Sequence, residues 1–182
     1  MDNLIRELYS DSIEKLSEKL GCDLPSPYPV VIFNSHPKKY CFDGVCQKEL
    51  TCGFYNPDND LIGLNNFCYD SFKKPGEFGI HEYVHKIQGY KGLYNLLPDN
   101  YYATMFFESL DNNLLDEIGI KPSSYPFETY IGKISLELNN TKASDLFKDQ
   151  SKVRSVYETF ENIYKEFNGV CKGMLLNKYN KK

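Results

Sequence analysis

The chain of 182 residues has no tryptophan, only three histidines and no long apolar run. Its longest aliphatic stretch, residues 30–33, is far shorter than the roughly 20 residues that a membrane-spanning helix needs. The N-terminus lacks the basic and apolar regions of a signal peptide, so the sequence predicts a cytoplasmic location. A net charge of −4 argues against nucleic acid or an anionic membrane as a partner.

Cysteine occurs six times, but no two cysteines form a C-x2-C pair, which argues against a separate structural zinc site. An even number suggests disulfides in a secreted chain, yet no export signal is seen, and buried free thiols are an equal alternative. Cys41 with Cys46, and Cys52 with Cys68, are the first pairs to test. The remaining two cysteines are Cys22 and Cys171.

What the chain does contain is the composition of a soluble, folded protein, with 41% hydrophobic and 25% charged residues. Its length suits a single domain over residues 1–182 with a sizeable core. The order of elements predicts an α+β fold in which a small mixed β-sheet packs on helices. We expect the core over about 28–118 and a helical part over about 120–170.

The first part of the chain is predicted to combine a helix with strands. Apolar spacing indicates a helix over 2–20 and a buried strand over 30–34, and the polar stretch 36–47 is expected to be a loop. Two β-prone runs, 50–55 and 61–65, are separated by Pro and Asx residues, which predicts a hairpin.

The rest of the chain is predicted to be mainly helical. Helices are expected over about 75–89 and over 99–117 with Asp99 as the N-cap. A helix is also favoured over 131–138, with a strand as the alternative because Ile134, Leu136 and Leu138 alternate with polar residues. A strongly amphipathic helix is expected over 153–169, where a glycine is expected to end it.

The most informative motif, His81-Glu82-Tyr83-Val84-His85, lies on the helix over 75–89 and matches H-E-x-x-H, the zinc-binding signature of metallopeptidases. Because a helix turns about 100° per residue, His81 and His85 lie on one face and can share one zinc ion. Glu82 is close enough to polarise a zinc-bound water. The adjacent apolar stripe, expected to dock this helix on the sheet, consists of Ile80, Val84 and Ile87.

A catalytic zinc site needs a third protein ligand and one open position. The metzincin continuation of the motif fails because Gln88 and Lys91 occupy its glycine and third-histidine positions. The third ligand is therefore expected to be a carboxylate on the following helix. Glu108 is the best placed, because it is mid-helix and follows a linker long enough to reverse the chain. The full set of candidates is Glu108, Asp111, Asp116 and Glu117.

Two polar residues one turn after Glu108 are candidates for supporting roles. Asp111 or Asn112 could hydrogen-bond a ligating histidine and fix its tautomer. The remaining histidine, His36, lies in a polar stretch, where an ordinary loop histidine is the favoured interpretation.

These features together resemble the gluzincins, zinc metallopeptidases with a site of two histidines and one glutamate. The resemblance rests on the hairpin runs 53–55 and 61–65, the helix with His81 to His85, and the later helix with Glu108. The compact layout is most similar to the small, single-domain minigluzincins, over roughly residues 28–118. In that family the second helix often carries an acid four residues after the ligand glutamate, whereas this chain has Asn112 there.

The resemblance implies a zincin-like fold and a zinc-dependent endopeptidase. In such a site zinc polarises the scissile carbonyl and its water, while Glu82 takes the proton and passes it to the leaving amine. A peptide or protein substrate would bind as an extended strand along an exposed edge of the hairpin over 50–65. Tyr101, Tyr102 and His36 are candidates for an additional transition-state donor.

Two other functions are compatible with the same residues. A catalytically silent or latent zincin-like protein would bind zinc or a protein partner without turnover, with a pro-segment or the C-terminal helix filling its cleft. A structural protein with an accidental motif would hold no stoichiometric zinc, and Glu108 would then be an ordinary surface acid.

Overall fold

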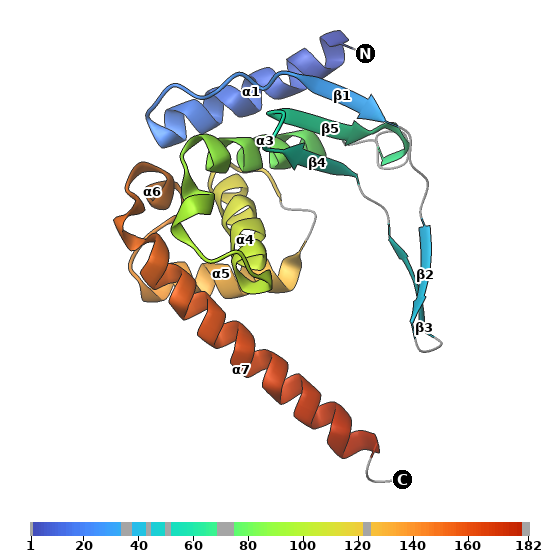
Figure 1. Ribbon diagram of the computed structural model, residues 1–182. Coiled ribbons are helices and arrows are strands. Elements are labelled where there is room, and N and C mark those ends of the chain that lie inside the picture. The colour runs from blue at the N-terminus through green and yellow to red at the C-terminus, as the bar shows by residue number, and fades with distance from the viewer. Residues whose placement is uncertain are drawn as a thin grey trace. The chain divides into compact units, whose positions relative to one another are not determined.

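The computed structural model combines helices with two small sheets in an α+β architecture, as expected (Figure 1). The chain divides into two compact units, residues 1–91 and 92–182, and the expectation of a single domain stays a prediction. Among the residues described, no helix is both long and apolar enough to cross a membrane. The structure describes residues 2–33, 38–42, 45–49, 52–68, 75–121 and 125–179.

The three-stranded mixed sheet of the first unit has the strand order β1-β5-β4 (Figure 1). Its strands are β1 (Val30–Phe33), β4 (Gly53–Asn56) and β5 (Leu61–Asn65). β1 runs parallel to β5, and β4 runs antiparallel to it with Phe54 opposite Gly63. The predicted hairpin is therefore confirmed, and β4 lies at an edge of this sheet.

The stretch over 36–47, expected to be a loop, instead contributes to a second sheet. Strand β2 (Lys38–Phe42) pairs antiparallel with β3 (Val45–Glu49). The expectation was wrong because the apolar residues of these strands are consecutive, Tyr40-Cys41-Phe42 and Val45-Cys46, and lack the alternation with polar residues that marks a strand in a sequence. Cys41 lies opposite Cys46 in the register, but the side chains of this pair lie outside the described part.

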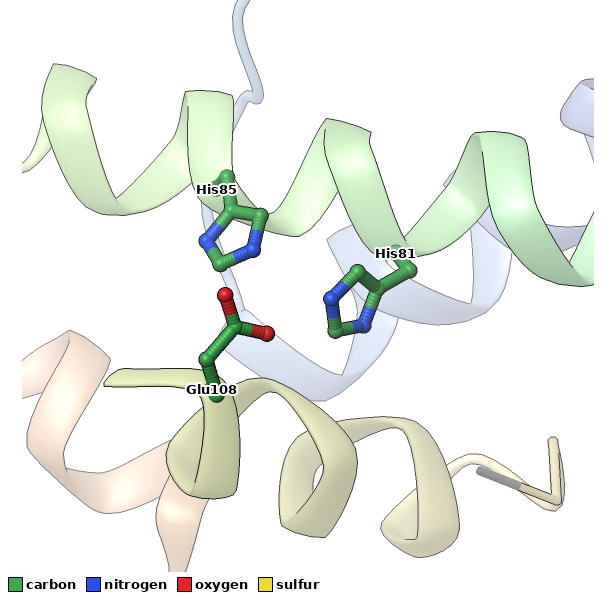
Figure 2. A group of neighbouring side chains, drawn as sticks. All are labelled: His81, His85 and Glu108. Atoms are coloured by element: carbon green, nitrogen blue, oxygen red, sulfur yellow. The ribbon is translucent and has the colours of Figure 1, made fainter. Parts of the chain in front are cut away.

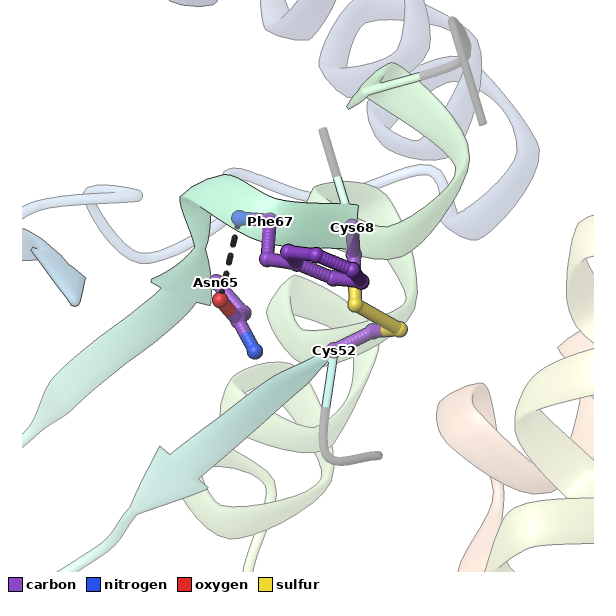
Figure 3. Close-up of a disulfide and its surroundings, with 4 residues drawn as sticks. All are labelled: Cys52, Asn65, Phe67 and Cys68. Carbon is purple, nitrogen blue, oxygen red and sulfur yellow. Dashed lines mark hydrogen bonds between the residues drawn. A yellow bond between two sulfur atoms is a disulfide. The ribbon is translucent and has the colours of Figure 1, made fainter. Parts of the chain in front are cut away.

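A disulfide joins Cys52 to Cys68, the second of the two pairs to test (Figure 3). It connects the residue before β4 to the short helical turn 66–68 that follows β5, with the two Cα atoms 5.5 Å apart. The backbone N–H of Asn65 donates to the Cys52 carbonyl oxygen at 2.8 Å, and the N–H of Phe67 donates to Asn65 Oδ1 at 3.1 Å. The beginning of β4 is thus held to the end of β5 by covalent and hydrogen bonds.

Helix α3 (Pro75–Tyr90) packs on β4 and β5, and α1 (Asp2–Leu20) packs on α3. Both helices have nearly the predicted bounds. The apolar stripe expected on α3 is fully buried, which confirms its role in docking the helix. The buried apolar residues of this unit include Leu16, Leu20, Ile62, Ile80, Tyr83, Val84 and Ile87.

Polar contacts also fix α3 to the sheet connections. Lys86 is only 1% exposed, and its ammonium group donates to the carbonyl oxygens of Tyr28 at 2.8 Å and Asp60 at 3.3 Å. The same nitrogen lies 2.9 Å from the Asp60 carboxylate. The hydroxyl of Tyr83 donates to the Pro25 carbonyl oxygen at 2.6 Å. These contacts link α3 to the segment before β1 and to the β4–β5 turn.

The second unit is helical. α4 packs on α5, α6 and α7, and α5 also packs on α7. Its core is apolar and includes Phe106, Leu110, Leu114, Ile131, Leu146, Phe147, Val156 and Phe160. The elements are η1 (Leu93–Leu96), α4 (Tyr101–Glu117), α5 (Pro126–Leu138), α6 (Ala143–Lys148), η2 (Gln150–Lys152) and α7 (Val153–Tyr179).

Two expected helix ends differ from the structure. The N-cap of α4 is Asn100 rather than Asp99, because the Asn100 side-chain oxygen accepts from the Ala103 N–H at 2.9 Å. α7 continues through Gly169 to Tyr179 instead of stopping at the glycine. A glycine inside a helix costs only about 1 kcal/mol relative to alanine, so it does not by itself end a helix whose earlier turns are well packed.

We expect Lys86→Met to lower the free energy of unfolding by about 2–3 kcal/mol, because two carbonyl oxygens and a carboxylate lose their donor while the apolar stem is kept. Urea unfolding followed by circular dichroism measures this change. The control is Lys165→Met, which removes an exposed i,i+4 pair with Glu161 and should have a much smaller effect. Equal losses in the two variants would contradict the anchoring role of Lys86.

Candidate metal centre

Helix α3 presents two imidazoles one turn apart. His81 and His85 are both half-buried, their ring centroids are 4.8 Å apart, and their planes are nearly perpendicular at 85°. The two rings lie one above the other because residues four apart share one face of a helix. That face borders the buried apolar stripe of α3, which packs on the sheet. The local geometry therefore suits two nitrogen ligands to one ion.

Gln88 orients one of these rings. It is fully buried, and its Oε1 lies 3.3 Å from Nδ1 of His85. In the tautomer that binds a metal through Nε2, Nδ1 carries the hydrogen and can donate it to this amide oxygen. Sequence reasoning used Gln88 only to exclude the metzincin pattern. The i,i+3 spacing from His85 was the available signal for its orienting role.

Glu108 completes a group of potential metal ligands with the two histidines. Each residue offers one ligand atom, and these atoms all lie within 4.8 Å of one another. Figure 2 shows the two imidazoles of α3 and the Glu108 carboxylate of α4 pointing toward one another. Of the four acids considered from the sequence, Glu108 is the one in this group. Glu117 Oε1 instead accepts from the Ser144 N–H at 3.3 Å.

The chemistry and spacing of this group suit a metal ion. Two imidazole nitrogens and one carboxylate oxygen form a donor set found in catalytic zinc sites, where bonds of about 2.0–2.2 Å place ligand atoms about 3.4 Å apart. A separation within 4.8 Å can close on an ion by side-chain shifts of about 1 Å. His81, His85 and Glu108 can therefore hold a metal ion, and three ligands leave one position of a tetrahedral site open.

Glu82 is the other acid beside the histidines. It follows His81 directly on α3, and its side chain is 8% exposed. Burial of an acid requires compensating interactions, so Glu82 is not an ordinary surface acid.

The two candidate supporting residues on α4 are both fully buried. The side-chain N–H2 group of Asn112 donates to Thr129 Oγ1 at 2.9 Å, which assigns Asn112 a role in packing α4 on α5. Asp111 lies one turn after Glu108. A role for either residue in orienting a metal ligand stays a prediction.

The two tyrosines proposed as transition-state donors contact α7. The Tyr101 and Tyr164 hydroxyl oxygens are 3.0 Å apart, and the Lys165 ammonium lies 5.0 Å from the centroid of the Tyr102 ring. Burial, with hydrogen bonds to Tyr101 and Glu128, raises the pKa of Tyr164 above its ordinary value. A catalytic role for Tyr101 or Tyr102 stays a prediction, and His36 lies outside the described residues.

Comparison of the chain with protein-family models, with curated proteins and with solved structures finds no match. The interpretation of the site therefore rests on its residues and their geometry.

Replacing Glu108 with Ala should weaken metal binding by at least about 10-fold, because one of three ligand atoms is lost. Zinc affinity can be measured by competition with a chromophoric chelator. Asp116→Ala, which removes an exposed acid from the same helix, is the matched control and should leave the affinity unchanged. Equal affinities of the Glu108 variant and the wild type would assign the third ligand elsewhere.

Gln88→Leu removes the acceptor at His85 Nδ1 and should weaken zinc binding by about 10- to 100-fold. Gln88→Glu keeps an acceptor oxygen there and should restore most of the affinity. The chelator competition, combined with thermal melting of the metal-free proteins, separates loss of orientation from loss of fold. A Leu variant that binds zinc as tightly as the Glu variant would contradict the orienting role.

Proposed function

We propose that the protein is a zinc-dependent peptidase of the gluzincin type, with a zincin-like arrangement of the sheet and α3. The observation that carries this proposal is the proximity of His81, His85 and Glu108 as potential ligands, with Glu82 adjacent on α3. Two imidazoles also suit copper, nickel or iron, but the combination with one carboxylate and a helical i,i+4 histidine pair favours zinc.

The three ligand residues have the simplest role. His81, His85 and Glu108 would hold the ion, with Nε2 of His85 as its ligand atom and Nδ1 facing the Gln88 side chain. A zinc ion bound there supplies Lewis acidity, which polarises a carbonyl oxygen and lowers the pKa of a coordinated water to about 7.

Glu82 is proposed as the general base. Glu82 directly follows the ligand residue His81 on α3. In this role its carboxylate would accept a proton from the attacking water and deliver it to the leaving amine. Its burial strengthens the effect of nearby charges on the transferred proton.

The edge of the sheet supports a peptide as the substrate. β4 has one hydrogen-bonded neighbour, β5, among the described strands, so its other edge is available for pairing with an extended chain. β4 also packs on α3, the helix that carries Glu82. An extended peptide paired to β4 would gain affinity through backbone hydrogen bonds, which require little sequence preference.

Glu82→Gln should keep zinc bound at the wild-type stoichiometry and lower peptide hydrolysis by at least about 100-fold, because the amide cannot accept the proton. Casein or a quenched fluorescent peptide serves as the substrate, with zinc measured by elemental analysis. Glu137→Gln, at an exposed position of α5, is the control and should hydrolyse at the wild-type rate.

Three outcomes distinguish the alternatives. Hydrolysis by the Glu82 variant at the wild-type rate would contradict the mechanism. A wild-type protein that binds one zinc ion but hydrolyses no substrate would favour the silent or latent zinc-binding protein. A wild-type protein without stoichiometric zinc would contradict the metal site itself.

A further inference from the structure

We propose that Gly53, the first residue of β4, is a positioning residue for the Glu82 carboxylate. Its bare backbone forms the surface against which the Glu82 side chain packs. This inference rests on the proposed function of Glu82 as the general base, but the contact itself is a property of the first unit alone. Gly53 and Glu82 both belong to that unit, on two elements that pack together.

The contact leaves no room for a side chain on β4. A Cβ atom added at Gly53 would lie 2.7 Å from both Cγ and Oε1 of Glu82 and 3.0 Å from its Cδ. Non-bonded carbon atoms prefer a separation of about 3.5–4.0 Å. Any residue other than glycine at position 53 would therefore require Glu82 or the strand to move.

The strand is less free to move than the side chain. Cys52, directly before Gly53, is fixed by the disulfide to Cys68 and by the hydrogen bond from Asn65. Gly53 itself is paired opposite Leu64 in the central strand β5. The Glu82 side chain, in contrast, has three rotatable bonds. It would therefore rotate, and its carboxylate would leave the position that it occupies against β4.

The requirement for glycine does not come from the backbone. Glycines at positive φ occur in the described part of the chain at positions 21, 92 and 119, whereas Gly53 lies in an ordinary strand conformation that alanine adopts easily. Replacement by alanine should therefore preserve the fold and the metal ligands. A group that must transfer a proton is sensitive to such a change, since a misplacement of about 1 Å can lower a rate by about 100-fold.

The first test is kinetic. Gly53→Ala should lower kcat for peptide hydrolysis by about 10- to 100-fold, while zinc content, KM and the melting temperature stay close to wild type. The control is Val31→Ala, which alters an exposed residue of β1 at the opposite edge of the sheet. A wild-type kcat in Gly53→Ala, or an equal loss in Val31→Ala, would overturn the proposal.

A double-mutant comparison tests whether Gly53 acts through Glu82. If it does, Gly53→Ala should have no further effect on the residual hydrolysis of Glu82→Gln. If the two losses multiply, Gly53 acts by another route and the proposal is wrong.

The decisive measurement does not need activity. Crystal structures of zinc-free wild type and zinc-free Gly53→Ala should show the Glu82 carboxylate displaced in the variant, with β4 and α3 unmoved. A Glu82 side chain in the same position in both structures would overturn the proposal. This comparison holds even if the wild type hydrolyses no substrate, an outcome that would contradict the proposed function rather than the contact.

Discussion

Burial of one side of α3 against the sheet is the constraint on which the candidate site depends. Ile80, Val84 and Ile87 are all removed from solvent, and this fixes the rotation of the helix. Because residues on a helix are separated by about 100°, the rotation also determines where the two imidazoles point. The buried ammonium of Lys86 adds a directional restraint that apolar packing alone lacks. The histidines are therefore held by the packing of residues that do not take part in the chemistry.

The packing of α3 on β4 also determines where Glu82, the proposed general base, lies. It is on the side of α3 that meets β4, where a glycine allows the strand backbone to approach the carboxylate closely. The disulfide next to this glycine fixes the strand end that makes the contact. A carboxylate enclosed in this way has fewer accessible rotamers and less contact with water, and both conditions favour a well-positioned proton acceptor.

Much of this arrangement could be predicted from the sequence because it depends on local patterns. The periodicity of α3 and the hairpin of β4 and β5 are of this kind. The Cys52–Cys68 disulfide was only one of two pairs to test, because cysteine spacing alone does not distinguish a disulfide from free thiols. The choice of Glu108 over the other acids used the expected position of α4 in the chain, and the structure groups Glu108 with the two histidines. Metal binding and catalysis by these residues remain proposals.

Other features could not be predicted because they depend on contacts between distant segments or on weak patterns. Nothing in the neighbourhood of Gly53 in the sequence indicates its contact with a helix about thirty residues later. The apolar residues of β2 and β3 are consecutive and do not alternate with polar ones, so they do not reveal the ribbon. The continuation of α7 beyond Gly169 reflects cooperative helix propagation, which a single glycine does not stop.

X-ray absorption spectroscopy of the zinc-loaded protein at the zinc edge is the most direct test of the proposed metal site, because it reports the ligand atoms themselves. We expect one zinc ion with two imidazole nitrogens and oxygen ligands at about 2.0–2.2 Å. The chain also offers thiols, such as the free Cys22, as competing ligands. Sulfur atoms at about 2.3 Å from the metal, or a spectrum without imidazole scattering, would contradict it.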